Sequence, residues 1–367
     1  MKILICLGTR PEAIKMAPLY HRLKDTKNIS VKLCITAQHR EMLDQVLNFF
    51  EIIPDYDLNL MRPNQTLNAL SATILSKIDE VLVLESPDVV LVHGDTTTSS
   101  MVALASFHRN IKVGHIEAGL RTFNKHAPFP EEINRQVTGR LADFHFAPTK
   151  IARQNLIKEG INKDTIVITG NTVIDALIWA KKKIDTGYIH PQIDELKKRF
   201  FESKLVLVTG HRRENFGKGF HDFCEALLEV SKNSNTQIVF PVHLNPNVQE
   251  PVNRLLSGIK NIHLIAPVEY PVMVWLMQRA ELIISDSGGI QEEAPTFHKQ
   301  ILVTREVSER PEGVASGFSI LVGTNKDLIV ENANYFLKNT ILIEGKNPYG
   351  NGRASQKIIK CLLKNLQ

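Results

Sequence analysis

Short apolar runs rich in β-branched residues alternate with amphipathic stretches along most of the chain, and this alternation limits the fold more than any other feature. Each apolar run predicts a strand, followed by polar or glycine residues and then by helical periodicity, as in Glu12–Lys24. In the first half these runs are Lys2–Leu7, Val31–Thr36, Val89–His93 and Lys112–Ile116. The pattern predicts an α/β fold, with helices on both faces of a parallel sheet.

The pattern starts again in the second half, so we expect two domains of the same kind. The second series of runs is Leu205–Thr209, Gln237–Phe240, Ile262–Ile265, Leu282–Ser285 and Gln300–Val303. A length of 367 residues suits two α/β domains better than one. We therefore predict two doubly wound, Rossmann-like domains that face a cleft, where the carboxyl ends of the strands bind ligands.

The domain limits follow from the same pattern. We expect an N-terminal domain over 1–172 and a C-terminal domain over 173–352, with a helix over 353–367 that packs back on the first domain. The segment Asp175–Phe200 has helical periodicity broken by Gly187 and Pro191, and we interpret it as the connection between the domains.

The amino-acid composition and net charge limit the kinds of partner that this protein is expected to bind. A hydrophobic content of 43% and a charged content of 23% are those of a soluble globular protein. The net charge of +5 is small and spread out, which disfavours nucleic acid and suits an anionic small molecule. No apolar stretch approaches the roughly 20 residues of a membrane span, and the N-terminal apolar run is too short for a signal peptide. We therefore expect a cytoplasmic protein with no membrane partner.

Three acids follow predicted strands or begin a predicted helix in the first half. Asp95 follows a strand in the segment HGDTTT, Glu117 ends the next strand, and Glu131 precedes a helical pattern. Each has an ordinary structural explanation, since Asp95 could cap the next helix and Glu131 could pair with a helix dipole. Carboxylates that meet at one sheet edge can also divide acid and base roles, so the three together indicate an active site. Glu132 is expected to be a surface residue.

Other segments favour binding of an anion such as a phosphate. Arg10 lies where the first strand meets the first helix, with Lys15 about one turn further on. His211 lies between a glycine and paired arginines at the corresponding strand end of the second half, in the segment TGHRREN. The segment Ser287-Gly288-Gly289 follows a strand and opens a helix, where backbone N–H groups could bind a diphosphate, and Glu293 lies one turn on, placed to accept hydrogen bonds from a ribose.

Several chemistries are disfavoured. Gly217-Lys218 does not have P-loop spacing, neither half has GxGxxG at its first strand end, and no HExxH-type metal pattern occurs. His115 and His243 are expected to be structural. The four cysteines, Cys6, Cys34, Cys224 and Cys361, are far apart in the sequence and form no CxxC pair. We therefore expect no metal and no cofactor.

An ordered series of motifs covers essentially the whole chain: GTRPEAIK, TAQHREML, VHGDTTT, HIEAGLRT, FPEEINR, TGNTVIDAL, TGHRREN, PVHLNPNV, SDSGGIQEEAP and ERPEGV. This series resembles the non-hydrolysing bacterial UDP-N-acetylglucosamine 2-epimerases. The resemblance implies two domains of the GT-B type, a homodimer, and reversible conversion of UDP-GlcNAc to UDP-ManNAc, a precursor of surface polysaccharides. It also implies a route in which UDP is eliminated to give 2-acetamidoglucal and is then added back.

The resemblance also assigns roles to residues. It makes Asp95, Glu117 and Glu131 the catalytic carboxylates and His211 an active-site histidine, with protons exchanged at C2 by Asp95 and Glu131. It further implies that the substrate is bound by Arg10, Lys15, Arg135, Ser287, Gly288, Gly289, Glu293 and Arg310. Some members are activated by their own substrate near the segment Gln38, His39 and Glu41, but this chain has Asn64 where those members have arginine, so activation stays open.

Alternatives to the epimerase also stay open at this point. One is a 2-epimerase acting on a UDP-GlcNAc modified at C3 or C6. Another is a GT-B glycosyltransferase that passes the sugar to an acceptor, and a third is a nucleotide-sugar-binding regulator without turnover. The last is disfavoured by the presence of all three acids.

Overall fold

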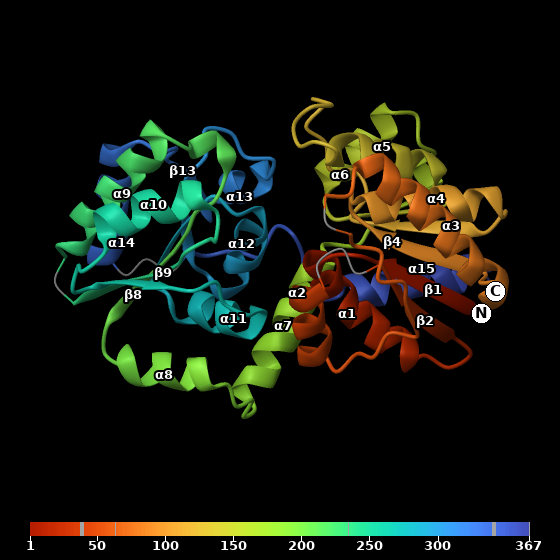
Figure 1. The fold of residues 1–367 in the computed structure, drawn as a ribbon, viewed down its shortest axis with the longest axis horizontal. Helices are drawn as coiled ribbons and strands as arrows, with labels where there is room; N and C mark the ends of the chain where they lie inside the picture. Colours follow the sequence, from red (N-terminus) through yellow and green to blue (C-terminus); the bar gives the residue numbers. More distant parts are fainter. Residues whose placement is uncertain (37–39, 63, 234, 340–342, 367) are drawn as a thin grey trace. The chain divides into compact units, whose positions relative to one another are not determined.

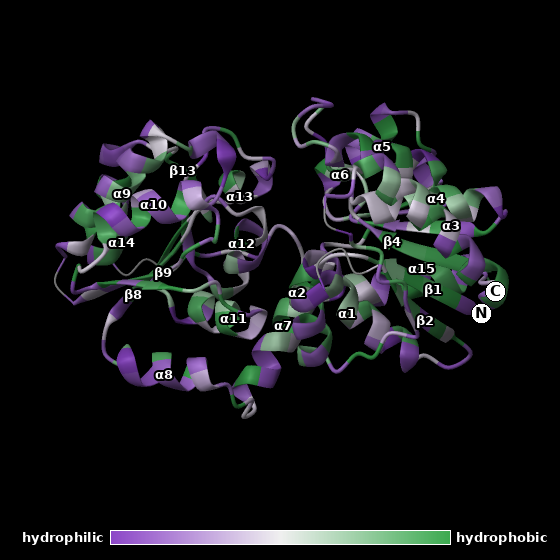
Figure 2. Ribbon diagram, in the orientation of Figure 1, coloured by the Kyte–Doolittle hydropathy of each residue, from purple (hydrophilic) through white to green (hydrophobic). Residues whose placement is uncertain are grey.

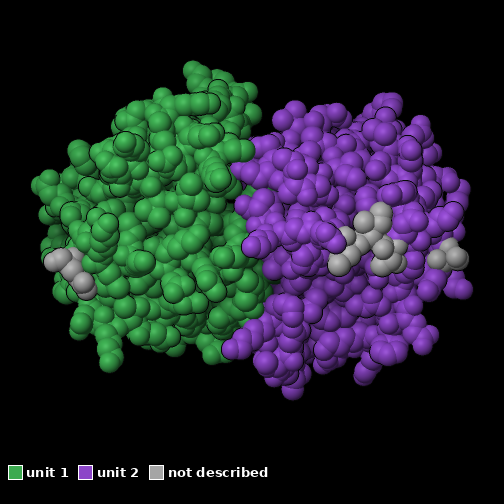
Figure 3. Space-filling model, turned by 180° about the vertical axis from the view of Figure 1, so that it is seen from behind, with its two compact units in different colours: residues 1–179, 349–367 green, residues 180–348 purple. Residues whose placement is uncertain are grey.

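The structure is a computed structural model that describes residues 1–36, 40–62, 64–233, 235–339 and 343–366. The chain divides into two compact units (Figure 3). Unit 1 contains Met1–Trp179 and Tyr349–Gln367, and unit 2 contains Ala180–Pro348. The expected boundary after residue 172 and the observed division after Trp179 both fall in one helix, α7 (Thr172–Asp185). Its first half belongs to unit 1 because Val173 and Ile174 pack there against Tyr349.

Unit 1 contains a parallel sheet in the order β3-β2-β1-β4-β5-β6-β7. Its strands are β1 (Lys2–Leu7), β2 (Ser30–Ile35), β3 (Tyr56–Asp57), β4 (Val89–His93), β5 (Lys112–Ile116), β6 (Phe144–Ala147) and β7 (Ile166–Ile168). Its helices, besides the first half of α7, are α1 (Arg10–Lys24), α2 (Arg40–Phe49), α3 (Leu67–Glu85), α4 (Thr97–His108), α5 (Glu131–Leu141), α6 (Lys150–Lys158), the 3-10 turn η1 (Lys163–Thr165) and α15 (Ala354–Leu366).

Helices cover both faces of this sheet (Figure 1). On one face, Ile74 and Ile78 of α3 and Val102 of α4 pack against Leu4 and Cys6 of β1. On the other face α1 packs against α2 and α15. Strands buried on both faces have near-continuous apolar sequences, and Figure 2 shows β1 and β4 as mainly hydrophobic.

Unit 2 contains a second parallel sheet, in the order β10-β9-β8-β11-β12-β13. Its strands are β8 (Lys204–Thr209), β9 (Thr236–Pro241), β10 (Ile262–Ile265), β11 (Leu282–Ser285), β12 (Gln300–Val303) and β13 (Ser319–Leu321). Its helices are α8 (Pro191–Arg199), η2 (Arg213–Asn215), α9 (Lys218–Ser231), α10 (Pro246–Leu256), α11 (Tyr270–Arg279), α12 (Gly288–Glu293), η3 (Ala294–Phe297), α13 (Pro311–Ala315) and α14 (Lys326–Lys338). One face is buried by α9, α10 and α14.

The order of strands in each sheet is that of a Rossmann fold. Strands two and three follow on one side of the first strand, and the fourth and later strands follow on its other side, so the strand order reverses between the first and fourth strands. The predicted α/β class with two Rossmann-like units is therefore confirmed. The reversal lies between β1 and β4 in unit 1 and between β8 and β11 in unit 2. Ligands of open α/β sheets bind outside the carboxyl ends of the strands at this point. Each unit therefore has one expected ligand site. Among the described residues no helix combines the length and apolarity that crossing a membrane requires.

Candidate functional site

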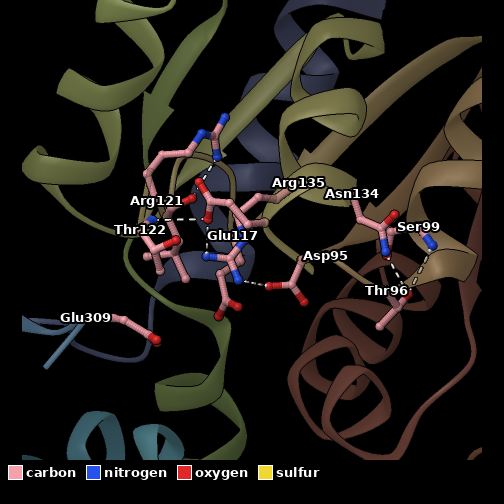
Figure 4. A network of polar contacts seen from close by, with 12 residues as sticks. Asp95, Thr96, Ser99, Glu117, Arg121, Thr122, Asn134, Arg135 and Glu309 are labelled. Atoms are coloured by element: carbon pink, nitrogen blue, oxygen red, sulfur yellow. Dashed lines mark hydrogen bonds and ion pairs between the residues drawn. The ribbon is translucent and has the colours of Figure 1, made fainter. Parts of the chain in front are cut away.

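Asp95 lies at the carboxyl edge of the unit 1 sheet, directly after β4 and the left-handed Gly94 (φ +65°). It does not cap the following helix, because the cap of α4 is Thr96, whose side chain accepts a hydrogen bond from Ser99 N. The Asp95 carboxylate instead receives a charged hydrogen bond from Arg135 Nη2 of α5 (Figure 4). The interpretation of Asp95 as a helix cap is therefore wrong.

The environment of Asp95 changes its proton affinity. Burial raises the pKa of Asp95 above its usual value, and the guanidinium of Arg135 opposes this rise. The negative charges of Glu117 and Glu131 raise the pKa of Asp95 further, so both acids lie near enough to act on it. A carboxyl group with a raised pKa is suited to take up and return a proton.

Glu117 follows β5 with a left-handed backbone (φ +64°), a conformation uncommon for a residue with a side chain. Its Oε2 accepts hydrogen bonds from Lys15 Nζ of α1 and from Asn171 Nδ2, the latter at 2.8 Å. His93 Nε2 lies 3.8 Å from the same oxygen. Burial lowers the pKa of His93 to about 4, so this imidazole is neutral at neutral pH. Glu117 thus stands among an ammonium, an amide and a neutral imidazole.

Glu131 is the first residue of α5, and Arg10 is the first residue of α1. Glu131 Oε2 is buried and, within the part of the chain that the structure describes, accepts no hydrogen bond. A buried acceptor of this kind is costly unless a ligand or water completes it. Arg10 is half-buried at the helix N-terminus.

Glu12 and Glu132 are buried acids that sequence reasoning missed or misplaced. Glu12 receives hydrogen bonds from Gly8 N, Thr9 and Thr96 at 2.8–2.9 Å, and so ties the loop after β1 to the loop after β4. The expectation that Glu132 lies at the surface is wrong, because this residue is fully buried. Its carboxylate accepts from Thr122 N and Phe123 N at 3.1 Å each, which stabilises the turn before α5.

Arg121 does not join the acids. Its side chain is fully buried and makes a two-pronged ion pair with Glu159, at 2.6 and 2.8 Å. His115 is structural as expected, since its buried ring contacts Gly94 O through Nε2 at 2.8 Å. Burial lowers the pKa of His115 to about 3.

In unit 2, His211 lies in the loop after β8 and is held by Asp286, which follows β11. The Asp286 carboxylate accepts hydrogen bonds from His211 N and Arg212 N, both at 2.8 Å, and its second oxygen lies 3.5 Å from His211 Nδ1. His243 stacks on His211, with ring centroids 5.2 Å apart and planes at 15°. Burial lowers the pKa of His211, while the charge of Asp286 opposes this shift. The stacking gives His243 a partner in the candidate site, which the expectation of a purely structural role did not include.

The segment Ser287–Gly289 follows β11 and opens α12. A Cβ on Gly288 would lie 2.4 Å from the Arg310 guanidinium carbon, so only glycine lets Arg310 pack this closely. Arg310 Nε donates to Glu292 Oε1 at 2.8 Å, and Glu292 is buried. Gly289 has ordinary space around its missing Cβ.

Glu293 is buried at the end of α12, and its Oε1 accepts a hydrogen bond from Tyr270 OH at 2.8 Å. The predicted phosphate and ribose residues of unit 2 are thus gathered on one strand end and its helix, with Arg310 packed against them.

Only some of the possible allosteric residues belong to the described part of the chain. Gln38 and His39 lie outside the described residues, and Glu41 is exposed in the first turn of α2. Asn64 is exposed with a left-handed backbone (φ +56°). Among the residues that can be placed, no group of three or more His, Cys, Asp or Glu side chains has the arrangement of a metal site.

Taken together, two Rossmann-like units, each with a candidate site where its strand order reverses, define a GT-B-like fold. The model of a protein family described as UDP-N-acetylglucosamine 2-epimerase matches residues 21–363. The chain belongs to this UDP-N-acetylglucosamine 2-epimerase family, which confirms the resemblance carried by the sequence motifs.

Individual relatives are similar to this chain over nearly their whole lengths. The chain is 52% identical to the UDP-N-acetylglucosamine 2-epimerase of Yersinia pestis, over 99% of this chain and 98% of that protein. It is 50% identical to the enzyme of Escherichia coli K12, over 100% and 99% of the two chains. A crystal structure of the Neisseria meningitidis UDP-GlcNAc 2-epimerase bound to UDP-GlcNAc matches with a TM-score of 0.91, 48% identity and complete coverage of both chains.

Proposed function

We propose that this protein interconverts UDP-N-acetylglucosamine and UDP-N-acetylmannosamine by inverting the configuration at C2 of the sugar. Family membership supports this proposal, as does the likeness to a solved 2-epimerase with UDP-GlcNAc bound. The observation that carries it is the cluster of Asp95, Arg135 and Glu117 at the carboxyl edge of the unit 1 sheet. Such a cluster supplies the carboxylates that the reaction needs.

The chemistry explains why carboxylates are needed. The C2–H bond is not next to a carbonyl, so simple deprotonation is difficult. In the proposed route the C1–O bond to UDP breaks, and the positive charge that develops at C1 makes the C2 proton acidic. A carboxylate takes this proton, leaving 2-acetamidoglucal and UDP. UDP then adds back at C1, and a proton is delivered to C2 from the opposite face. Carboxylates stabilise the same type of charge in glycosidases.

The surroundings of each acid support a division of roles. Asp95 has a raised pKa and is proposed to exchange a proton at C2, with Glu131 as the second exchanging acid. Glu117, held by Lys15 and Asn171, is proposed to act as a fixed negative charge that orients the sugar. Arg10, Lys15, Arg135 and His211 are proposed to stabilise the departing diphosphate.

The proposed nucleotide residues lie in unit 2. We propose that Ser287, Gly288 and Gly289 bind the UDP phosphates, that Glu293 binds the ribose, and that Arg310 supports this side. The packing of Arg310 against Gly288 is consistent with this assignment. The reaction involves no net oxidation or reduction, so it requires no redox cofactor.

Proton NMR of UDP-GlcNAc with the purified protein in deuterated water tests the proposal. We expect UDP-ManNAc to form without an acceptor sugar, metal or nicotinamide cofactor, with deuterium incorporated at C2. Product without deuterium would exclude the elimination route. Transfer only in the presence of an acceptor would indicate a glycosyltransferase instead, and binding without turnover would indicate a regulator.

Finer features of the proposal have separate tests. A UDP-GlcNAc modified at C3 or C6 is the alternative substrate, and competition between the two sugars in the same NMR assay distinguishes them. A homodimer is implied by the family resemblance, and sedimentation velocity tests it. A cytoplasmic location is expected from the sequence. Activation by UDP-GlcNAc stays open, and a sigmoidal dependence of rate on its concentration would reveal it.

A further inference from the structure

Asn171 lies in unit 1, at the start of the helix through which the chain leaves that unit. It is the last residue before α7, the helix that continues into unit 2, and it is 2% exposed. Its side-chain Oδ1 accepts a hydrogen bond from Val173 N at 3.0 Å, which caps the first turn of α7. Its side-chain Nδ2 donates to Glu117 Oε2 at 2.8 Å. One side chain therefore joins the start of α7 to a proposed catalytic carboxylate.

The returning chain is fastened at the same place. Tyr349 is the first residue of unit 1 after unit 2, and its carbonyl accepts a hydrogen bond from Asn171 N at 2.7 Å. A Cβ on Gly170 would lie 3.3 Å from both Gly350 Cα and Tyr349 O, so the two backbones pass each other closely. We call Gly170–Val173 together with Tyr349–Gly350 the junction. Its two segments belong to unit 1: the first opens α7, the helix that leads to unit 2, and the second is where the chain returns from unit 2.

The donors to Glu117 differ in how strictly they fix it. Lys15 offers an ammonium on a flexible stem, and this group can donate in several directions. The Asn171 amide is planar, and its other end is already fixed by Val173 N. Asn171 is therefore the contact that sets the direction of the Glu117 carboxylate, while Lys15 balances its charge.

We propose that Asn171 is a positioning residue that fixes the carboxylate of Glu117 to the junction, an inference that rests on the proposed epimerase function. A displacement of the junction backbone moves the Asn171 amide, and with it the oxygen of Glu117 that faces Lys15. Glu117 is in this way linked by hydrogen bonds to the start of α7 and to the segment at which the chain returns to unit 1.

Two substitutions separate this role from helix capping. Ser and Asp both cap helices well, so Asn171→Ser and Asn171→Asp keep an acceptor for Val173 N. Neither offers the amide donor to Glu117 at neutral pH. We expect kcat to fall about 10- to 100-fold in both variants, with the KM for UDP-GlcNAc and the affinity for UDP little changed.

The pH dependence of the activity of Asn171→Asp distinguishes a positioning role from a purely structural one. Two carboxylates side by side disfavour a pair of negative charges, so the introduced carboxyl should bind a proton on acidification to about pH 5. In its protonated form it can donate a hydrogen bond to Glu117, as the amide does in the wild type. The activity of Asn171→Asp relative to wild type should then rise, while that of Asn171→Ser should not.

Other groups that face Glu117 are common to both variants and therefore cancel in this comparison. They are Lys15 from α1, His93 from the end of β4, and Asp95 from the loop that follows β4. Any change of their protonation between pH 7 and pH 5 affects the two variants and the wild type alike.

Asn325→Ser is the matched control, because Asn325 caps α14 through Leu328 N at 3.0 Å and α14 contains none of the proposed site residues. Its kcat should equal that of wild type. If wild type converts UDP-GlcNAc and both Asn171 variants retain full kcat, the positioning role is wrong. The positioning role is also wrong if the loss of kcat is fully explained by a lower unfolding midpoint and if the activity of Asn171→Asp does not rise in acid. A wild type without epimerase activity would instead contradict the proposed function.

Discussion

At the scale of single residues, Asp95 and Glu117 show how neighbours separate two similar acids. Asp95 faces an arginine and has a pKa raised by burial, whereas Glu117 is held by a lysine and an amide at one oxygen. The two carboxylates therefore suit different tasks, proton exchange for Asp95 and fixed electrostatic support for Glu117.

Substitution of Asp95 by asparagine keeps the size of the side chain but removes its ability to exchange a proton. We expect kcat to fall by about 10²- to 10⁴-fold or more, while UDP still binds, since the residues proposed to bind its phosphates and ribose in unit 2 are unchanged. Steady-state NMR kinetics and calorimetric titration with UDP measure the two quantities. Glu131→Gln should behave similarly, and Asp327→Asn at an exposed position of α14 is the control. Retained turnover in both Asp95→Asn and Glu131→Gln would refute their assignment to proton transfer.

At the scale of elements, the turn before α5 depends on a carboxylate from the helix that follows it. Glu132 accepts hydrogen bonds from two backbone N–H groups, those of Thr122 and Phe123, and lies 3.4 Å from Arg135. It thus joins the turn to the helix that delivers Arg135 to Asp95. A helix and its preceding turn are positioned together by one buried acid.

Replacement of Glu132 by alanine leaves both backbone N–H groups without this acceptor. We expect the free energy of unfolding of unit 1 to fall by about 2–4 kcal/mol, measured by urea denaturation. The control is Glu80→Ala in α3, which removes an exposed surface pair with Lys77 and should change stability by less than about 1 kcal/mol. Equal effects of the two substitutions would show that Glu132 has no structural role.

At the scale of the whole molecule, buried histidines make stability depend on pH. His93 and His115 are buried, with pKa values lowered by burial to about 4 and about 3. In the unfolded chain a histidine titrates near about pH 6.5. Between about pH 6.5 and pH 4 the unfolded chain therefore binds protons that the folded chain does not, and stability falls as the pH falls through this window.

Each of these histidines should contribute a slope of up to about 1.4 kcal/mol per pH unit. The chain has two tryptophans, Trp179 in unit 1 and Trp275 in unit 2. Trp275→Phe therefore leaves Trp179, which packs on Phe50 with centroids 4.8 Å apart, as a fluorescence reporter of unit 1. In this background His115→Gln should reduce the pH slope of urea stability by about one proton. An unchanged slope would contradict a neutral, buried His115.

Much of the fold was predictable because long, buried strands carry a strong apolar signal. Val89–His93, Lys112–Ile116 and Leu282–Ser285 were predicted with the bounds that the structure shows. The short strands β3 (Tyr56–Asp57) and β7 (Ile166–Ile168) were not predicted, because two or three residues cannot display a period.

The candidate site divides in the same way. Local sequence patterns were enough to predict the α/β class, the two series of strands, the family motifs and the placement of Asp95 and Glu117 at strand ends. The partners of these acids could not be predicted in this way, because they come from distant parts of the chain. Glu132 is buried because distant N–H groups converge on it, and Asn171 reaches Glu117 because the end of β5 and the start of α7 meet. Local patterns set where the chain turns, whereas contacts between residues far apart in the chain depend on how its elements pack.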